Sequence, residues 1–274
     1  MWSLNILLNK LLNGGGYNDQ EQVDGKSLVQ SYNYPRNDKS TKEVLVQSRF
    51  INVPHIKQER MWDCGLVCVL MVLKTLNINH YDIEDLEAFC GTDSIWTVDL
   101  AYLLQKLSIS FSYITITLGA NPNYSLETFY EKQLTDDIVR VNTLFKRSKE
   151  AGIDIECRSI KEDELAVLIL SGKCLVIALV DQYILSRPWT EDVYVPDFYS
   201  GSSGYTGHYI VICGYDALTD EFEIRDPASS RIRETISSRC LEKARKSFGT
   251  DEDILLVTRI IIFVFIISII LNVH

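Results

Sequence analysis

The sequence predicts an α+β fold in which a buried helix led by a cysteine packs on a mainly antiparallel sheet. The segment from Cys64 to Leu76 is apolar on almost every side, which is typical of a helix buried all round. Later in the chain, a run from Tyr209 to Cys213 and a run from Glu221 to Arg225 flank a short Asp-rich loop, and this spacing predicts an antiparallel hairpin. Helices that come first and strands that come later are typical of the α+β class.

The other elements follow from local apolar patterns. Between residues 97 and 107, leucines recur at the spacing of one helix face, so this segment predicts an amphipathic helix. We expect Thr97 to cap that helix and Trp96 to pack beside it. A first strand is predicted at residues 46–53, further helices at 125–150 and 162–171, and a buried strand at 174–180.

Composition limits the class of protein. The chain has 274 residues, of which 46% are hydrophobic, so it can bury a full core without disulfide or metal staples. Its formal net charge of −10 repels phosphate backbones, which argues against nucleic acid as a partner. The seven cysteines form no CxxC pair and show no zinc-ligand spacing, so we expect no structural metal and thiols that stay reduced in the cytosol.

Sequence character divides the chain into three parts. Residues 1–47 are expected to form a variable, partly disordered N-terminal arm, and residues 48–257 the folded domain. Residues 258–274 form an apolar tail, and the apolar stretch reaches nearly the length of a membrane span when it is counted back to Ile254. The tail is either a C-terminal membrane anchor or a buried segment, and both alternatives stay open.

Cys64 is the candidate nucleophile. It opens the buried helix, so its sulfur faces free backbone N–H groups and the positive end of the helix dipole, which favour a thiolate. Cys68, one helical turn later, is expected to pack in the core. The alternative for Cys64 is that it, too, is a small core residue.

Gln58 is the candidate donor to an oxyanion. It precedes Cys64 by a reach that allows its amide to donate beside the Cys64 backbone N–H. Gly65 follows the cysteine and carries no side chain that could obstruct approach to the sulfur.

His208 is the candidate general base. It follows a flexible stretch rich in Ser and Gly and opens the strand of residues 209–213, where a ring is held rigidly and stays open to substrate. The other histidines, His55, His80 and His274, lie in loop-like or terminal positions. The alternative for His208 is an ordinary surface histidine.

Asp226 is the candidate that orients His208. If the hairpin turns near Leu218, the two residues lie on one face of the sheet as diagonal neighbours, close enough for a carboxylate to hold an imidazole. A shift of the pairing by one residue would move Asp226 to the other face. The alternative is a simple turn residue before Pro227.

These motifs resemble those of known families. The resemblance to papain-like cysteine peptidases of the bacteriocin-processing type rests on Gln58, Trp62-Asp63-Cys64-Gly65, Gly207-His208-Tyr209-Ile210-Val211 and Asp226-Pro227. A narrower resemblance, to the guanylyl cyclase domain-containing protein family of animals and plants, rests on Ser94-Ile95-Trp96-Thr97-Val98-Asp99, Arg140-Val141-Asn142 and Phe248-Gly249-Thr250-Asp251-Glu252-Asp253-Ile254. It runs from about Val53 to Val257. The resemblance implies a papain-like fold and a cytoplasmic protein, and the family name implies synthesis of cyclic GMP.

The residues favour a cysteine hydrolase that cleaves an amide, isopeptide or related acyl bond of a peptide or protein. In this hypothesis Cys64 attacks, and His208 takes and returns the proton. Asp226 orients His208, and Gln58 helps to hold the oxyanion. No cofactor is required.

Two other functions stay open. A guanylyl cyclase, as the family name implies, would need GTP and Mg²⁺ or Mn²⁺. The sequence has no phosphate-binding glycine loop, and the acidic run from Asp251 to Asp253 is more typical of a solvated loop than of a metal site. The third function is a catalytically silent adaptor on the same fold.

Overall fold

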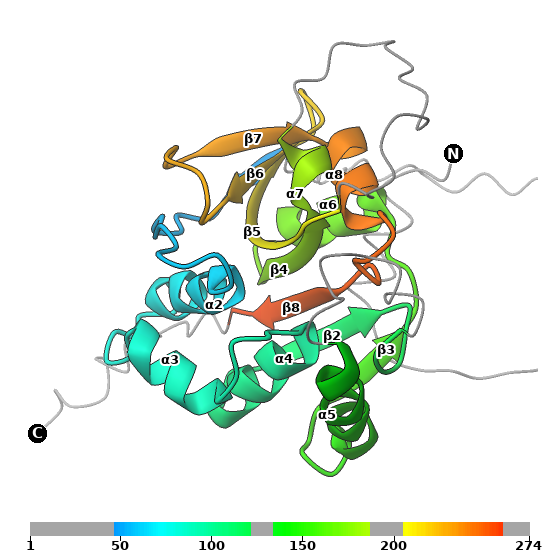
Figure 1. Cartoon of the computed structure of the whole chain (residues 1–274). Coiled ribbons are helices and arrows are strands. Elements are labelled where there is room, and N and C mark those ends of the chain that lie inside the picture. The colour runs from blue at the N-terminus through cyan, green and yellow to red at the C-terminus, as the bar shows by residue number, and fades with distance from the viewer. Residues whose placement is uncertain (1–46, 122–133, 187–204, 260–274) are drawn as a thin grey trace, which may run out of the picture. The chain divides into compact units, whose positions relative to one another are not determined.

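The computed structural model describes residues 47–121, 134–186 and 205–259 (Figure 1). These residues belong to one compact unit that begins at Gln47. They form an eight-stranded sheet with helices packed on it, which confirms the predicted α+β class. The expected arm before Gln47, most of the apolar tail and the first part of the helix expected at residues 125–150 lie outside the described residues.

The sheet is mainly antiparallel, as predicted. Its strands lie in the order β3-β2-β8-β4-β5-β6-β7, with β1 paired to β5, and only β2 and β3 run parallel. The strands are β1 (Ser48–Phe50), β2 (Phe111–Thr115), β3 (Ile155–Cys157), β4 (Cys174–Asp181), β5 (Gly207–Asp216), β6 (Glu221–Arg225), β7 (Glu234–Ser237) and β8 (Ile254–Thr258). The predicted first strand, buried strand and hairpin correspond to β1, β4 and β5–β6.

The helices cover both faces of the central strands (Figure 1). They are α2 (Cys64–Thr75), α3 (Ile83–Cys90), α4 (Thr97–Lys106), α5 (Leu134–Arg147), α6 (Glu162–Leu170), α7 (Gln182–Leu185) and α8 (Ser238–Arg245). Along β4, Leu175 and Ile177 belong to the core under α2 and α4, whereas Val176 and Ala178 belong to the core under α6 and α8. Because both faces are buried, β4 is apolar without alternation.

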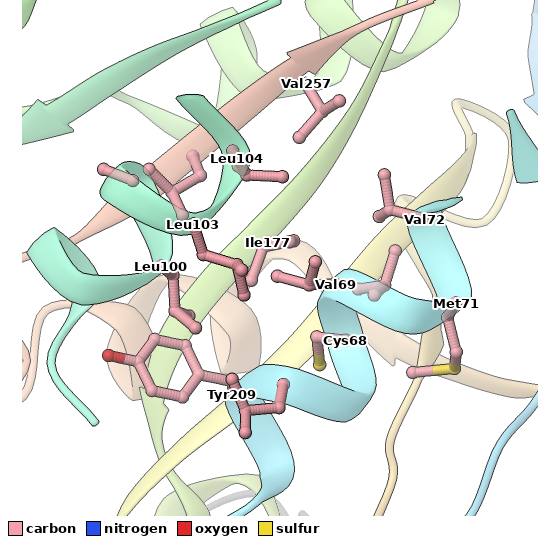
Figure 2. Close-up of a cluster of buried hydrophobic side chains, with 14 of the residues drawn as sticks. Cys68, Val69, Met71, Val72, Leu100, Leu103, Leu104, Ile177, Tyr209 and Val257 are labelled. Carbon is pink, nitrogen blue, oxygen red and sulfur yellow. The ribbon is translucent and has the colours of Figure 1, made fainter. Parts of the chain in front are cut away.

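Helix α2 is buried all round, as predicted. Every residue from Cys64 to Leu73 is buried, so the helix has no solvent face. Figure 2 shows Cys68 and Val69 of α2 directed toward side chains of α4, β4 and β5. Cys68 is fully buried in this core, which matches its expected role as a packing residue.

Helix α4 begins at Thr97, as predicted, but its N-cap is a different residue from the expected one. Trp96, not Thr97, is the N-cap, and the Asp99 carboxylate accepts a hydrogen bond of 2.8 Å from the Trp96 backbone N–H. Thr97 is the first helical residue, and its hydroxyl lies 2.9 Å from the Tyr209 hydroxyl. The expected Thr97 cap is therefore wrong, because the Asp99 side chain does the capping and Thr97 turns inward to β5.

Strand β8 corrects the expectation for the C-terminal part of the chain. Ile254 to Thr258 lie between β2 and β4 in the middle of the sheet. The apolar stretch therefore cannot be counted back to Ile254 as part of a membrane span, because these residues fill the core. None of the helices in the described ranges combines the length and the apolar character needed to cross a bilayer.

Candidate active site

Cys64 is the first residue of α2, and Asp63 precedes it as the N-cap. Its side chain is 6% exposed and lines a cleft of about 260 Å³. The N–H groups of a first helical turn have no partner within the helix, and together with the helix dipole they favour a negative charge at this position. The candidate nucleophile therefore lies at a helix start that faces a cleft.

Gly65 lets the start of α2 approach its neighbours closely. A Cβ at this position would lie 3.0 Å from Cδ1 of Leu100 and 3.0 Å from Cδ2 of Tyr209. Both contacts are tighter than ordinary van der Waals packing, so a larger residue would push α2 away from α4 and β5. Close packing of α2 against α4 and β5 is therefore a reason for glycine at this position.

The loop before Cys64 is held by the buried side chain of Asp63. One oxygen, Oδ2, accepts hydrogen bonds from the backbone N–H groups of Glu59 (3.2 Å) and Arg60 (3.1 Å). Asp63 is only 1% exposed, so these bonds are shielded from competing water. The chain therefore turns tightly just before the nucleophile.

His208 lies near the start of β5 and contacts both Asp226 and Cys64. Its Nε2 lies 2.7 Å from Oδ1 of Asp226. The Cys64 side chain is close enough to the ring to contribute to the raised pKa of His208, and because Nε2 is engaged with Asp226, Nδ1 is the nitrogen left for the sulfur. The structure thus brings three of the predicted residues together in the order Cys64, His208, Asp226.

A β-bulge between β5 and β6 puts Asp226 on the same face as His208. Gly214 pairs with Glu223, but Ile212 pairs with Ile224, so the register shifts by one residue at Cys213. Continued past Arg225, the shifted register places Asp226 opposite Ile210, which shares a face with His208. Without the bulge, Asp226 would be opposite Val211 and would point to the other face.

Charges and hydrogen bonds set the protonation of this group. Burial alone would lower the pKa of His208, but hydrogen bonds and charge interactions with Asp226 and Cys64 outweigh burial and raise the pKa to about 9. Burial favours a raised pKa for Asp226, yet the His208 ring and the N–H groups of Ala228 and Ser229 lower it overall. At neutral pH the arrangement therefore contains an imidazolium beside an ionised carboxylate.

Gln58 lies beside the Asp226 segment, but its amide has another partner. Its backbone N–H donates to the carbonyl of Pro227 at 2.9 Å, and its side-chain Nε2 donates to the carbonyl of Arg60 at 2.8 Å. Its Oε1 is buried and has no hydrogen-bond partner among the described residues. The role of Gln58 as an oxyanion donor stays a prediction, since that role requires the amide to turn from Arg60 toward Cys64.

His55 contacts the backbone of Asp226, which the sequence did not reveal. Its Nε2 donates to the backbone carbonyl of Asp226 at 3.0 Å. Two residues earlier, the carbonyl of Val53 accepts a 2.9 Å hydrogen bond from Nε of the buried Arg225. Hydrogen bonds therefore hold residues 53–58 alongside residues 225–227. No sequence motif marks this contact, because it joins segments far apart in the chain.

We expect His55→Leu to slow alkylation of Cys64 about fivefold, because one hydrogen bond to the Asp226 backbone, worth about 1 kcal/mol, is lost. His55→Gln keeps a side-chain N–H donor and should retain most of the rate. The measurement is the second-order rate of iodoacetamide reaction at Cys64, followed by mass spectrometry, alongside the melting temperature. Equal rates for the two variants would contradict a positioning role for the His55 N–H.

The far wall of the cleft is fixed by Arg140 of α5. Its Nη2 lies 2.7 Å from Oδ1 of Asp137 and donates to the carbonyl of Ser94 at 2.9 Å, and Nη1 forms an ion pair with Asp99. Nε1 of Trp96 donates to Oδ2 of Asp137 at 3.0 Å. The two motifs around Trp96 and Arg140 therefore form one network, which holds Ser94 and Trp96 at the cleft.

The acidic run from Asp251 to Asp253 is only partly a solvated loop. Asp253 is 7% exposed and lines the same cleft as Cys64, as does Asp251. The expectation of a solvated loop is therefore wrong for Asp253, because the chain turns inward there to enter β8. The described lining residues are Met61, Trp62, Cys64, Asp93, Ser94, Ile95, Trp96, Thr97, Asp137, Leu179, Gly207, Tyr209, Gly249, Asp251 and Asp253.

Known proteins resemble this chain in sequence and in structure. The sequence model of a family described as guanylylate cyclase matches residues 53–257. Guanylyl cyclase 1 of Arabidopsis thaliana is 55% identical over 264 residues, which cover 94% of this chain and 96% of that protein. A C39-like peptidase candidate from Bacillus anthracis has a TM-score of 0.46 at 15% identity, over 76% of this chain and 94% of its own. Xylellain, a cysteine protease from Xylella fastidiosa, has a TM-score of 0.41 at 13% identity, over 78% and 86%.

Proposed function

We propose that this chain, which belongs to the guanylylate cyclase family, is a cysteine hydrolase that cleaves an amide, isopeptide or related acyl bond of a peptide or protein. One observation carries the proposal. The His208 ring lies between Asp226 and Cys64: its Nε2 is 2.7 Å from the carboxylate, and the Cys64 side chain, which lines the cleft, is close enough to raise the pKa of the ring. A nucleophile, a base and a group that orients the base are the parts that acyl transfer requires.

The reaction begins with attack of the Cys64 thiolate on the substrate carbonyl carbon. A carbon–sulfur bond forms, and the carbonyl electron pair moves to the oxygen, where the Cys64 backbone N–H and the turned amide of Gln58 donate hydrogen bonds. The His208 imidazolium then gives its proton to the leaving nitrogen, and the bond to that nitrogen breaks. Neutral His208 next takes a proton from water, which attacks the thioester and releases the acid and the Cys64 thiolate. Asp226 holds the ring throughout.

The relative from Arabidopsis thaliana is named a guanylyl cyclase, so cyclic GMP synthesis is the second candidate. That reaction requires metal-binding carboxylates and cationic groups for the phosphates. In the described ranges, no group of three His, Cys, Asp or Glu side chains has the arrangement of a metal site. Described lining residues of the cleft include four aspartates and no lysine or arginine, so they do not fit a nucleoside triphosphate.

Labelling with a thiol-directed probe tests the proposal. We expect the full-length chain to react with iodoacetamide at Cys64 at neutral pH much faster than at the other cysteines, because only Cys64 contacts a protonated imidazole among the described cysteines. The labelled residue is identified by peptide mass spectrometry. Cys64→Ala should abolish the fast phase, and Cys157→Ala, which removes an exposed thiol on β3, should leave it intact.

The same samples separate the alternatives. Cyclic GMP formed from GTP with Mg²⁺ or Mn²⁺, at an equal rate in wild type and Cys64→Ala, would favour the cyclase and contradict the proposal. A Cys64 thiol that reacts no faster than the exposed Cys157 would favour a silent adaptor.

A further inference from the structure

The cleft beside Cys64 is strongly acidic. Its described lining includes the side chains of Asp93, Asp137, Asp251 and Asp253, and no lysine or arginine. Arg140 lies next to the lining residue Asp137, but its guanidinium already forms ion pairs with both Asp137 and Asp99. Its positive charge therefore does not balance the other carboxylates at the cleft.

Asp253 is a buried carboxyl whose hydrogen bonding is incomplete. The Tyr113 hydroxyl donates to its Oδ2 at 3.1 Å, but its Oδ1 is buried and has no hydrogen bond of normal geometry among the described residues. The hydroxyls of Thr97 and Thr115 are near enough to lower the pKa, yet burial dominates and raises it to about 8. A buried polar atom without a full set of partners is rare in a folded protein and needs an explanation.

A strained turn holds Asp251 near this carboxyl. Asp251 and Glu252 have φ angles of 48° and 52°, in the left-handed region that non-glycine residues seldom adopt. The Thr117 hydroxyl fixes the Asp251 side chain by donating to Oδ1 at 2.7 Å. The negative charge of Asp251 is also one reason why the pKa of Asp253 is raised. The turn therefore keeps two acidic groups together in spite of their repulsion.

We infer that this cleft binds a cationic group of the substrate, the side chain of a lysine or arginine or a free α-amine, beside the bond that Cys64 attacks. Asp251 and Asp253 are its counter-charges. The inference rests on the proposed hydrolase function and adds the class of substrate. A cation in the cleft would offset the burial of Asp253 and the repulsion by Asp251, and would give the unpartnered Oδ1 a donor. Binding would release a proton from Asp253 near neutral pH.

Charged reagents of equal size test the inference on the full-length chain. The trimethylammonium reagent MTSET and the sulfonate reagent MTSES form the same kind of mixed disulfide with a thiolate, and their rates are measured at Cys64 by peptide mass spectrometry. The exposed Cys157 reports the effect of the overall negative charge in the same sample. We expect the ratio of the MTSET rate to the MTSES rate to be about tenfold higher at Cys64 than at Cys157.

Two variants and a matched control test whether Asp251 and Asp253 cause the preference of Cys64 for MTSET over MTSES. Asp251→Asn and Asp253→Asn should each lower the ratio at Cys64 about threefold at pH 8. Glu221→Gln removes one charge at the opposite end of the hairpin from His208 and should leave the ratio unchanged. Equal ratios at Cys64 and Cys157, or ratios that the two variants do not change, would overturn the inference alone. No reaction of Cys64 with either reagent would overturn the hydrolase proposal itself.

Peptide probes then distinguish the source of the cation. Three peptidyl vinyl sulfones are compared: one with lysine and an acetylated amine, one with norleucine and a free α-amine, and one with norleucine and an acetylated amine. A lysine-binding cleft should react at least about tenfold faster with the first, and an amine-binding cleft with the second. Equal rates for all three would overturn the inference.

Discussion

Replacing His208 by alanine is expected to slow the reaction of Cys64 with iodoacetamide at pH 7 by about 100-fold, or about 2.7 kcal/mol, the scale of one lost contact to a charged group. In the wild type the pKa of His208, about 9, keeps the ring protonated at neutral pH, and its positive charge stabilises a thiolate next to it. Without the ring, a thiolate at Cys64 loses this stabilising positive charge. Rates are measured as a function of pH by peptide mass spectrometry.

The shape of the pH profile separates this explanation from general unfolding. The imidazolium persists to about pH 9, so the ratio of the wild-type rate to the variant rate should be largest near pH 6 and should shrink as the pH rises through about 9. His80→Ala, which removes an exposed histidine beyond the far end of α2, is the control and should keep the wild-type rate at every pH. A ratio that does not change with pH would contradict stabilisation of the thiolate by the His208 charge.

The elements that could be predicted from sequence are those with a local pattern. Helix α2 is apolar on all sides, and the β5–β6 hairpin has alternating strands with an Asp-rich turn, so both were predicted close to their observed bounds. Cys64 and His208 could be identified because each opens an element, where a side chain is both held and accessible. Helix α3, which was not predicted, does carry a recognisable signal. Asp82 and Asp85 form a capping box, and Gly91 ends the helix.

The features that could not be predicted depend on contacts between distant segments. The bulge at Cys213 decides which face Asp226 takes, yet nothing in an alternating apolar strand marks the position of an extra residue. Strand β8 looks like the beginning of the apolar tail, because a central strand buried on both faces has no polar alternation. Asp253 looks like a residue of an exposed loop because its neighbours in sequence are also acidic. In the structure its side chain is buried.

Asp253→Asn is expected to stabilise the protein, and to do so more at high pH. The pKa of Asp253 is raised to about 8, mainly by burial, from an ordinary value of 3.8. The folded state therefore holds a proton that the unfolded state has lost. For such a group the stabilising contribution is complete below about pH 4 and is lost progressively as the pH rises through about 8. Asparagine cannot ionise, and its Oδ1 can still accept from the Tyr113 hydroxyl.

The measurement is urea unfolding of wild type and variant at pH 5, 7 and 8. Each pH unit well below 8 costs the wild type about 1.4 kcal/mol relative to the variant, and the last unit before pH 8 costs less. The advantage of Asp253→Asn should therefore grow by about 3.6 kcal/mol from pH 5 to 8. Other groups with raised pKa values, such as Asp99 and Glu162, are present in both proteins and cancel in the difference. Glu221→Gln supplies the baseline for loss of one carboxylate. A difference that does not change with pH would mean that Asp253 is ionised in the folded protein, and the acidic turn would then carry two full negative charges before any cation binds.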